Sequence, residues 1–468
     1  MFTIEEIARA TGGSIRGDAT GTVSGVSTDS RLVKAGELFV PLRGERFDGH
    51  DFIVPAMGRG VRVFLAQSGW IRENALPSAA TVVAVEDTLR ALGDLAAFHR
   101  RRFRIPVVGI TGSNGKTTVK EMLAAILALT GSGLKTSGNL NNLIGLPQML
   151  LQLKDGDSWA VLEMGMSEPG EIDRLAEIAG PEVGVITNAF AAHLESMGSV
   201  AAVAAAKGEL FQRLLPGGCA VYNADDPLIS RLTTPDGVRR LSFGLYGGEI
   251  SAGNLERKGR QGQKFTLTLN GEGYQVRLKA LGLHNISNSL AAAAAACAMG
   301  VAAEDICRGL EQFTPYDKRF NLEELDGIVL IDDSYNANPA SMRAAMETLR
   351  DIREECRAIA VLGDMLELGE ITKEAHLELG SFAASCVERL YVMGEMAETV
   401  AEGARRGGLP QGAVILADSH EEIIADLRNS LASGDFILVK GSRGMGMEKV
   451  AEGIRREFPV TGLKGAVA

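Results

Sequence analysis

A glycine-rich segment carries the clearest chemistry in this chain. Residues 109–118 read GITGSNGKTT. Glycines let backbone N–H groups turn toward an anion and approach it closely, and a lysine adds a positive charge. A hydroxyl directly after that lysine can bind Mg²⁺ beside a polyphosphate. The segment therefore predicts a loop that binds ATP, called the phosphate loop below, with these residues: Thr111, Gly112, Ser113, Asn114, Gly115, Lys116, Thr117 and Thr118.

The phosphate loop departs from the general pattern at one position. That pattern has a glycine five residues before Gly115, but Ile110 stands there and Gly109 comes one residue too early. The context still fits, because an apolar run precedes the loop and a helix is expected from Lys116 to about Leu129. A tight turn with a chance lysine is the alternative.

Three residues beyond the loop are candidates for metal binding or catalysis. Glu163 ends an apolar run, where a carboxylate could reach a Mg²⁺ ion held by Thr117. His193 follows the next apolar run, and Lys207 lies in a helical stretch after several alanines. The alternatives are an ordinary carboxylate at a strand end, a structural histidine and a lysine whose charged end reaches the surface.

The elements that must position these residues alternate between strand and helix. Strands are expected at 105–110, 158–163 and 183–188, each followed by a helical stretch, and then a small antiparallel insert with strands at 248–256, 265–269 and 274–280. An alanine-rich helix is expected at 286–299. A second alternation, with strands at 328–331, 357–362, 389–393, 413–416 and 436–439, predicts an open doubly wound sheet.

The first 85 residues mix short strand patterns, at 37–42, 61–66 and 81–85, with glycine-rich turns. A helix is expected at 86–102. It ends in four arginines between positions 100 and 104, which we interpret as a solvated helix end near a domain join.

Size and charge limit the classes of function. The chain has 468 residues, enough for about three domains, and a net charge of -11. It has no long basic run, so neither nucleic acid nor a membrane is expected as a partner. Its five cysteines are far apart and form no C-x-x-C motif, as is typical of reduced thiols. We expect a cytoplasmic protein, because the first residues are acidic and no stretch is apolar enough to span a membrane.

Nine motifs in a fixed order resemble those of the Mur ligase family. They are TGSNGKTT, KTSGNLNN, VLEMG, TNAFAAHLE, AKGEL, LGLHNISN, DDSYNANPASM, LGDMLELG and KGSRG. The resemblance covers nearly the whole chain. DDSYNANPASM and LGDMLELG are similar to motifs of the type that adds D-alanyl-D-alanine, whereas TGxNGKT also occurs in folylpolyglutamate synthases. That variant lacks the leading glycine, which accounts for Ile110.

The resemblance implies an α/β protein of three domains. Residues 1–85 would form a small mixed α/β domain that binds the UDP end of the substrate. Residues 86–316 would form a central P-loop-type ATPase domain with a parallel-rich sheet. Residues 317–468 would form a Rossmann-like doubly wound domain that closes over ATP.

The resemblance also implies roles for single residues. The UDP end would contact Ser27, Thr28, Asp29, Ser30, Arg31, Arg43, Gly44, Asp48, Gly49 and His50. Asn139, Asn141 and Asn142 would approach the nucleotide and the acceptor carboxyl, and Asn288 the base or ribose. Lys116 would contact phosphate, Thr117 and Glu163 one Mg²⁺ ion, and His193 a second; Lys207 would be carbamylated. Without the resemblance, the N-terminal residues would be read as a surface hairpin and Asn288 as a helix-surface residue.

In the third domain the resemblance implies that Arg319 meets phosphate and Asp333 the ribose. The dipeptide pocket would be bordered by Asn336, Ala337, Asn338, Asp364, Glu367 and Leu368. Lys440, Ser442 and Arg443 could meet an acidic group of the substrate.

The implied activity is ATP-dependent ligation. A carboxylate is phosphorylated to an acyl phosphate, which the amine of D-Ala-D-Ala attacks, extending UDP-N-acetylmuramoyl-tripeptide for peptidoglycan. We expect a monomer that needs ATP and Mg²⁺. The alternatives are a related ligase for another amino acid and a nucleotide-dependent switch without ligation chemistry.

Overall fold

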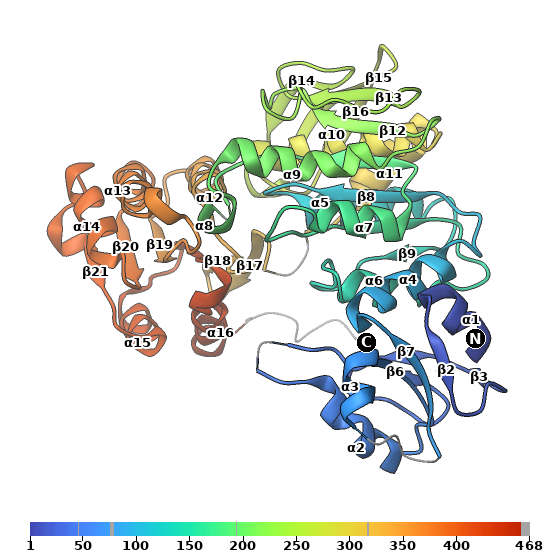
Figure 1. Cartoon of the computed structure of the whole chain (residues 1–468). Coiled ribbons are helices and arrows are strands. Elements are labelled where there is room, and N and C mark those ends of the chain that lie inside the picture. Colours follow the sequence, from blue (N-terminus) through green and yellow to red (C-terminus); the bar gives the residue numbers. More distant parts are fainter. Residues whose placement is uncertain (45, 75–78, 193, 316–317, 460–468) are drawn as a thin grey trace, which may run out of the picture.

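The computed structural model describes residues 1–44, 46–74, 79–192, 194–315 and 318–459. Sheets of five, nine and six strands follow one another along this part of the chain, each packed against helices (Figure 1). A separate two-stranded ribbon of β1 (Phe2–Thr3) and β3 (Thr22–Val23) lies near the start of the chain. The α/β class predicted from the sequence is confirmed.

The five-stranded sheet forms the core of the first domain. Its strand order is β2-β7-β6-β5-β4, and β2 alone runs antiparallel to its neighbour. Its strands are β2 (Ser14–Arg16), β4 (Val26–Ser27), β5 (Leu38–Phe39), β6 (Val63–Gln67) and β7 (Thr81–Val85). Its helices are α1 (Ile4–Thr11), the short η1 (Gly49–Phe52), α2 (Ile53–Gly58) and α3 (Ser68–Glu73).

Helix α4 (Thr88–Arg100) joins the first domain to the central one. Its apolar residues Leu92 and Leu95 pack into the first domain's core, and its Ala96 packs into the central core. The expectation of a solvated end is wrong for Arg100, which is buried. Its guanidinium donates to the carbonyl of Ile105 at 2.9 Å and pairs with Glu182 at 3.2 Å. The helix end is thus a structural joint.

The nine-stranded sheet runs through the central domain in the order β16-β15-β14-β13-β12-β11-β8-β10-β9. Its strands are β8 (Val107–Thr111), β9 (Leu134–Lys135), β10 (Ala160–Glu163), β11 (Val183–Ile186), β12 (Cys219–Asn223), β13 (Arg239–Gly244), β14 (Ile250–Arg257), β15 (Gln263–Leu269) and β16 (Glu272–Leu278). Neighbours from β9 to β14 are parallel, and β14, β15 and β16 pair antiparallel. The three strands expected as an insert therefore extend the main sheet.

Helices cover both faces of this sheet (Figure 1). They are α5 (Lys116–Leu127), α6 (Gly145–Leu150), α7 (Glu171–Ala179), α8 (Leu194–Met197), α9 (Val200–Gln212), α10 (Leu283–Ala298) and α11 (Ala303–Gln312), with the short η2 (Gly259–Gln261) between β14 and β15. Because side chains alternate along a strand, Val108 and Ile110 pack toward α5 and α10, whereas Val107 belongs to the core with α7 and α9. The phosphate loop thus starts from a strand packed on both faces.

The six-stranded sheet of the third domain has the order β17-β18-β22-β19-β20-β21, and β17 alone is antiparallel. Its strands are β17 (Asn321–Leu325), β18 (Ile328–Asp333), β19 (Ala358–Gly363), β20 (Arg389–Met393), β21 (Val414–Leu416) and β22 (Phe436–Lys440). Its helices are α12 (Pro339–Ile352), α13 (Thr372–Ala383), α14 (Ala397–Arg406), α15 (His420–Ser430) and α16 (Glu448–Glu457), with the short η3 (Gly369–Ile371), η4 (Gln411–Ala413) and η5 (Arg443–Met445). Helices α12, α13 and α14 share one core, and α15 and α16 share that of the opposite face. This is the expected doubly wound arrangement.

The three sheets fall within the predicted ranges 1–85, 86–316 and 317–468, and the boundaries themselves stay predictions. None of the helices in the described ranges has the length and apolar character that a membrane span requires.

Candidate functional site

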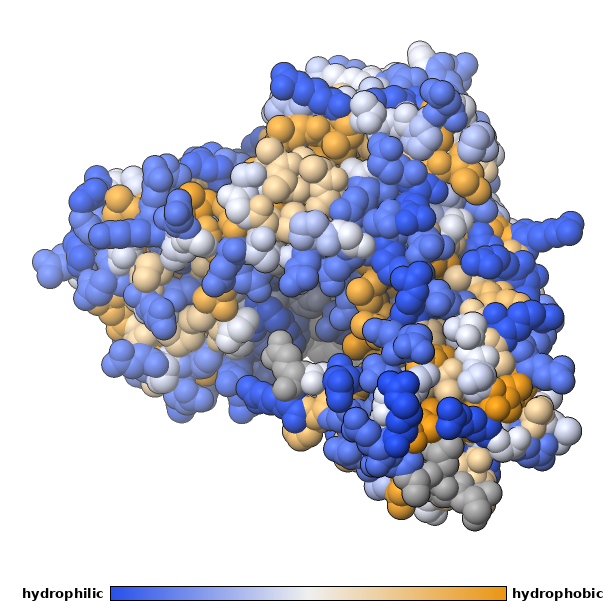
Figure 2. Space-filling model, viewed as in Figure 1, coloured by the Kyte–Doolittle hydropathy of each residue, from blue (hydrophilic) through white to orange (hydrophobic). Residues whose placement is uncertain are grey.

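A cavity of about 760 Å³ lies between the central and third domains. It is lined by the phosphate loop, the loops after β10 and β11, the first turns of α10 and the loop between β18 and α12. Figure 2 shows the surface deeply hollowed where the third domain meets the rest of the molecule, with mainly hydrophilic residues around the opening. Both domains therefore contribute to one site.

The phosphate loop leaves β8 and ends where α5 begins. Gly115 caps the helix with φ of 84°, and a Cβ there would lie 2.2 Å from Asn288 Oδ1. Lys116 Nζ donates to the Gly112 carbonyl at 2.7 Å, and burial lowers the pKa of this lysine. Ile110, which replaces the usual glycine, is a buried strand residue. The tight part of the loop thus begins only after β8 ends.

Oxygen ligands suited to a hard cation meet beside this loop. Thr117 Oγ1 donates to Glu163 Oε2 at 2.9 Å, and Asn141 Nδ2 donates to Glu163 Oε1 at 2.9 Å. The Glu163 side chain is buried. A carboxylate and a hydroxyl this close together fit Mg²⁺, which prefers oxygen ligands. Within the described residues no group of three or more His, Cys, Asp or Glu forms a metal site, and His193 lies outside them.

Lys207 enters the cavity from α9. It is buried, so its charged end does not reach the surface as the alternative would have it. Burial lowers the pKa of its amine well below the usual value, and the positive charge of Lys116 lowers it further. Carbamylation requires the uncharged amine, and a lowered pKa favours that form.

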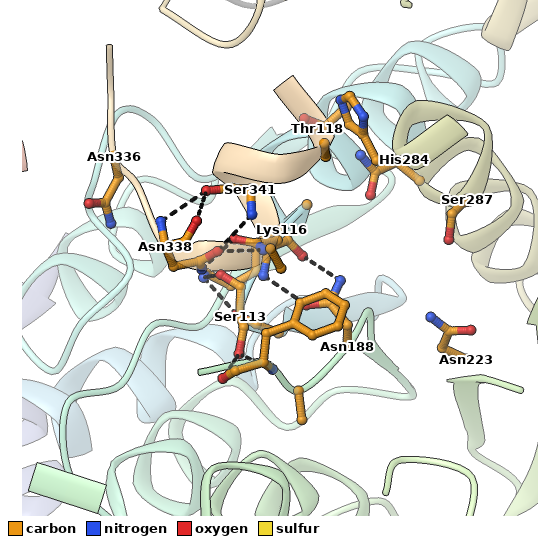
Figure 3. A pocket seen from close by; sticks show the side chains of 18 of the residues that line it. Ser113, Lys116, Thr118, Asn188, Asn223, His284, Ser287, Asn336, Asn338 and Ser341 are labelled. Carbon is orange, nitrogen blue, oxygen red and sulfur yellow. Dashed lines mark hydrogen bonds between the residues drawn. The ribbon is translucent and has the colours of Figure 1, made fainter. Parts of the chain in front are cut away.

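The third domain presents cations and amides to the same cavity. Arg319 reaches across to Thr117 Oγ1 at 3.3 Å, and its guanidinium lies 3.9 Å from the centre of the Tyr335 ring. Lys440 Nζ pairs with Asp333 at 2.7 Å and donates to the Asn336 carbonyl at 2.8 Å. Figure 3 shows the Asn336 to Ser341 segment opposite Ser113 and Lys116. Positive charge thus faces the phosphate loop from the opposite wall.

Comparison with known proteins assigns the chain and its fold to a family. The chain matches the Mur ligase family, catalytic domain over residues 22–100, the Mur ligase middle domain over 110–296 and the Mur ligase, glutamate ligase domain over 318–443. It is 35% identical over 433 residues to UDP-N-acetylmuramoyl-tripeptide--D-alanyl-D-alanine ligase of Bacillus subtilis, covering 92% of this chain and 93% of that one. The chain belongs to the Mur ligase family. The Escherichia coli ligase of the same name is 36% identical, covering 97% of this chain and 98% of its own.

Solved Mur ligases have the same three-domain arrangement. MurF from Acinetobacter baumannii superposes with a TM-score of 0.89 at 33% identity, covering 97% of this chain and 99% of that one. MurF from Thermotoga maritima in complex with ADP superposes with a TM-score of 0.82 at 31% identity, covering 92% of this chain and 97% of that one. The resemblance stated from the motifs is confirmed.

Most residues expected at the nucleotide, the metal or the dipeptide do line the cavity of this Mur ligase. From the central domain these are Gly112, Ser113, Asn114, Gly115, Lys116, Thr118, Asn141, Asn142, Glu163, Lys207 and Asn288. From the third domain they are Arg319, Asp333, Asn336, Ala337, Asn338 and Lys440. Their roles stay predictions.

Other expected residues do not line this cavity. Thr111 and Thr117 are buried beside it, and Asn139 is exposed. Asp364 accepts the backbone N–H of Glu395 at 2.7 Å, and burial raises the pKa of this carboxyl. The Glu367 carbonyl accepts the N–H of Glu195 at 3.4 Å. The LGDMLELG loop therefore meets the central domain at α8, outside the cavity.

The rest of the KGSRG motif also lies outside the cavity lining. Ser442 Oγ donates to the Ala337 carbonyl at 3.3 Å, and the Arg443 guanidinium pairs with Glu448 at 2.8 Å. The Ser442 contact braces the loop before α12, whereas the Arg443 pair joins the motif to α16.

The N-terminal residues form two loops in the first domain of this Mur ligase, and none lines the cavity. In the first loop, Asp29 forms a two-pronged contact with Arg31, whose hydrogen bonds lower the pKa of Asp29 to about 2. Thr28 Oγ1 accepts from Gln148 of α6 at 2.6 Å, which links this loop to the central domain. Ser27 and Ser30 flank these residues.

The second loop is braced by its own charges. Arg43 pairs with Asp48 at 3.1 Å, and His50 Nδ1 lies 2.6 Å from the same carboxylate. The buried His50 ring also stacks on Trp70, with Gly44 and Gly49 at the turns. These contacts fix the conformation of the loop, so His50 has a structural role.

Sequence reasoning missed several residues of the cavity. His284 lies at the start of α10, and burial lowers its pKa to about 4, so it is neutral at pH 7. Tyr335 and Asn188 also line the cavity. All three residues stand inside quoted motifs, LGLHNISN, DDSYNANPASM and TNAFAAHLE, which were the signal that could have identified them.

Proposed function

We propose that this protein is an ATP-dependent ligase that joins D-Ala-D-Ala to UDP-N-acetylmuramoyl-tripeptide in peptidoglycan precursor synthesis. One observation carries the proposal: the phosphate loop and the Thr117–Glu163 pair face Arg319 and the DDSYNANP loop across one cavity. The support from relatives is that the B. subtilis and E. coli proteins bear this activity in their names and that the T. maritima structure holds ADP.

The first half-reaction moves the γ-phosphoryl group of ATP to the substrate carboxylate. The N–H groups of the phosphate loop and the ammonium of Lys116 would bind the phosphates, and Arg319 would stabilise charge from the opposite side. Thr117 and Glu163 would hold Mg²⁺, whose charge neutralises that of the phosphate oxygens. Most of the rate gain in such a site comes from positioning and electrostatics.

The second half-reaction forms the amide. The amine of the dipeptide attacks the acyl carbon, a tetrahedral intermediate collapses, and inorganic phosphate leaves. We propose that the loop of Asn336, Ala337 and Asn338 borders the dipeptide. Closure of the third domain would exclude water, which would otherwise hydrolyse the acyl phosphate.

The remaining assignments complete the proposal. The two N-terminal loops would bind the UDP end, since Arg31 and Arg43 offer the planar donors that diphosphates favour. Lys207 would act as its carbamate, an anion suited to a second metal ion. Catalysis would take place in the cytoplasm on a single chain.

The product decides between this function and its alternatives. The protein is incubated with ATP, Mg²⁺, UDP-N-acetylmuramoyl-tripeptide and D-Ala-D-Ala, and the products are weighed by mass spectrometry. The proposal requires the pentapeptide product with one ADP per amide. In parallel incubations, single amino acids replace D-Ala-D-Ala. Ligation of one of them instead would make the protein a related ligase, and ATP binding without any amide would favour a switch.

A further inference from the structure

A pair of side-chain amides joins the phosphate loop to the third domain. Asn114 Nδ2 donates to Asn338 Oδ1 at 3.1 Å, and Asn338 Nδ2 donates to Asn114 Oδ1 at 2.8 Å. Each carboxamide supplies both a donor and an acceptor, so the two bonds form a closed ring that neither Asp nor Ser could reproduce. Figure 3 shows Asn338 directed toward the phosphate loop.

Asn114 is fixed from the central-domain side. Its backbone N–H donates to Asn188 Oδ1 at 2.8 Å. Its carbonyl accepts from Thr187 Oγ1 at 2.6 Å and from Asn188 Nδ2 at 3.1 Å. Because both main-chain groups are bound to the loop after β11, the side chain faces the third domain in a defined direction.

Asn338 is fixed equally well from the other side. Its Oδ1 caps α12 by accepting the N–H of Ser341 at 2.9 Å, and its own N–H donates to Ser341 Oγ at 3.0 Å. Only 7% of the residue is exposed. The amide is therefore preorganised, and pairing costs little side-chain entropy.

The segment before Asn338 is held by the end of β22 and by the loop that follows it. Lys440 Nζ binds the carbonyl of Asn336, and Ser442 Oγ binds that of Ala337. The Asn338 amide thus ties the whole proposed dipeptide loop to the proposed phosphate site.

Other polar contacts across these two domains, including Glu195 with Glu367 and Arg260 with Glu324, are longer or more exposed. On the cavity side Arg319 makes one long bond, at 3.3 Å, to Thr117. Away from the cavity Arg257 pairs with Asp351 at 2.6 Å, but Arg257 is nearly half exposed, and such pairs contribute little. The amide pair, with two short hydrogen bonds and a buried Asn338, is the most directional contact between the walls among these.

From this geometry we infer that Asn114 and Asn338 form a closure latch, a positioning pair that keeps the third domain on the phosphate loop until the amine has attacked. The inference rests on the proposed function. When the latch is intact, the amine nitrogen bonds to the acyl carbon and phosphate leaves. When it opens early, water attacks the same carbon, which returns the carboxylate and releases phosphate without amide. The latch therefore sets how many phosphates are released per amide.

The test uses Asn114→Ala, Asn338→Ser and the double variant in the full chain. Serine is as good a helix N-cap as asparagine, so Asn338→Ser removes the pair and retains the cap. Losing two neutral hydrogen bonds should lower kcat for amide formation roughly 10- to 100-fold. Phosphate released per amide should rise above one in each variant, with a smaller change in KM for ATP than in kcat. Asn429→Ser, an exposed amide on α15, is the matched control and should behave as wild type.

The double variant separates a latch from two independent effects. If the residues act through each other, the double variant is no slower than the poorer single variant. Effects that multiply, or one phosphate per amide in all variants, would overturn the latch while leaving the ligase intact. A loss of rate matched by lower melting temperature in both single variants would also overturn it. A wild-type protein that makes no amide would overturn the proposed function, and the latch with it.

Discussion

Replacing Gly115 with alanine tests the geometry of the phosphate loop directly. Gly115 has a φ of 84°, where a residue with a Cβ is strained. The added Cβ would lie 2.2 Å from Asn288 Oδ1, far inside contact distance. The Asn288 side chain cannot move away at no cost, since it is buried and its Nδ2 donates to Asn285 Oδ1 at 3.0 Å.

The cost has two parts. The left-handed backbone costs about 1–2 kcal/mol for alanine. Displacing Asn288 loses a hydrogen bond, worth about 1 kcal/mol. The loop can avoid both by shifting out of its present shape, which withdraws its N–H groups from the phosphates. We therefore expect ATP to bind roughly 30- to 150-fold more weakly, from about 2–3 kcal/mol, with little change in melting temperature.

Titration calorimetry with ATP and thermal melting followed by circular dichroism measure the two quantities. Gly180→Ala is the matched control, because Gly180 has a φ of 54° and no atom lies within 4 Å of the added Cβ. Gly180→Ala, at the end of α7, has the strain of the left-handed backbone without a steric clash. A second test is Gly115→Ala in an Asn288→Ala background, where the space has been cleared.

Two results would refute this reasoning. One is a Gly115→Ala protein that binds ATP as well as the Gly180→Ala protein does. The other is strict additivity of Gly115→Ala and Asn288→Ala, since residues that collide must show coupled effects.

Three further substitutions probe charge. Lys116→Met should lower kcat/KM about 10³-fold, because one charge about 4 Å from a phosphate is worth about 4 kcal/mol at an effective dielectric constant of about 20. Steady-state kinetics measure this, with the exposed Lys373→Met as control. An equal fall of kcat/KM in the control would contradict the prediction. Burial lowers the pKa of Lys207 well below 10.5. At a pH between the pKa of the folded protein and that of the unfolded chain, only the unfolded chain binds this proton. The free energy of unfolding therefore rises with pH in that window. Lys207→Met should therefore raise the melting temperature of the substrate-free protein at pH 7, with a gain that shrinks toward pH 10.5; a gain independent of pH would contradict this. Arg455→Met should lower the free energy of unfolding by about 2 kcal/mol, because it removes the cation that pairs at 2.7 Å with the buried Asp332 carboxylate. Urea unfolding measures this change. An unchanged urea midpoint would contradict the prediction.

Local patterns were enough for most of the fold. The strands at Thr81–Val85 and Arg389–Met393 have the predicted bounds, since each is an apolar run between turn residues. Strand β13 was missed because two arginines and a serine interrupt its sequence RRLSFG and leave no apolar run. Arg240 is accommodated there because its guanidinium lies 4.4 Å from the Tyr222 ring centre and binds the Ser230 carbonyl. Such contacts with residues distant in sequence do not appear in a local pattern.

The candidate site also has a part that local motifs predict and a part that depends on contacts between distant segments. Motifs bring Lys116 and Glu163 to the correct strand ends, because the ends of parallel strands meet at one edge of a sheet. The pairing of Asn114 with Asn338 joins residues 224 positions apart and depends on how two domains dock. Asp364 could not be placed either, because its backbone partners follow a different strand, β20.

The shared helix α4 has a consequence for dividing this protein into pieces. Leu92 and Leu95 complete the hydrophobic core of the N-terminal sheet, while Ala96 serves the core of the next one. A fragment that ends at residue 85 would lack the two leucines of its hydrophobic core. A fragment that starts at residue 86 would expose the same leucines to solvent. Either piece would aggregate more readily than the intact chain. The N-terminal region is therefore a folding partner of the ATPase core, and the two are best expressed together.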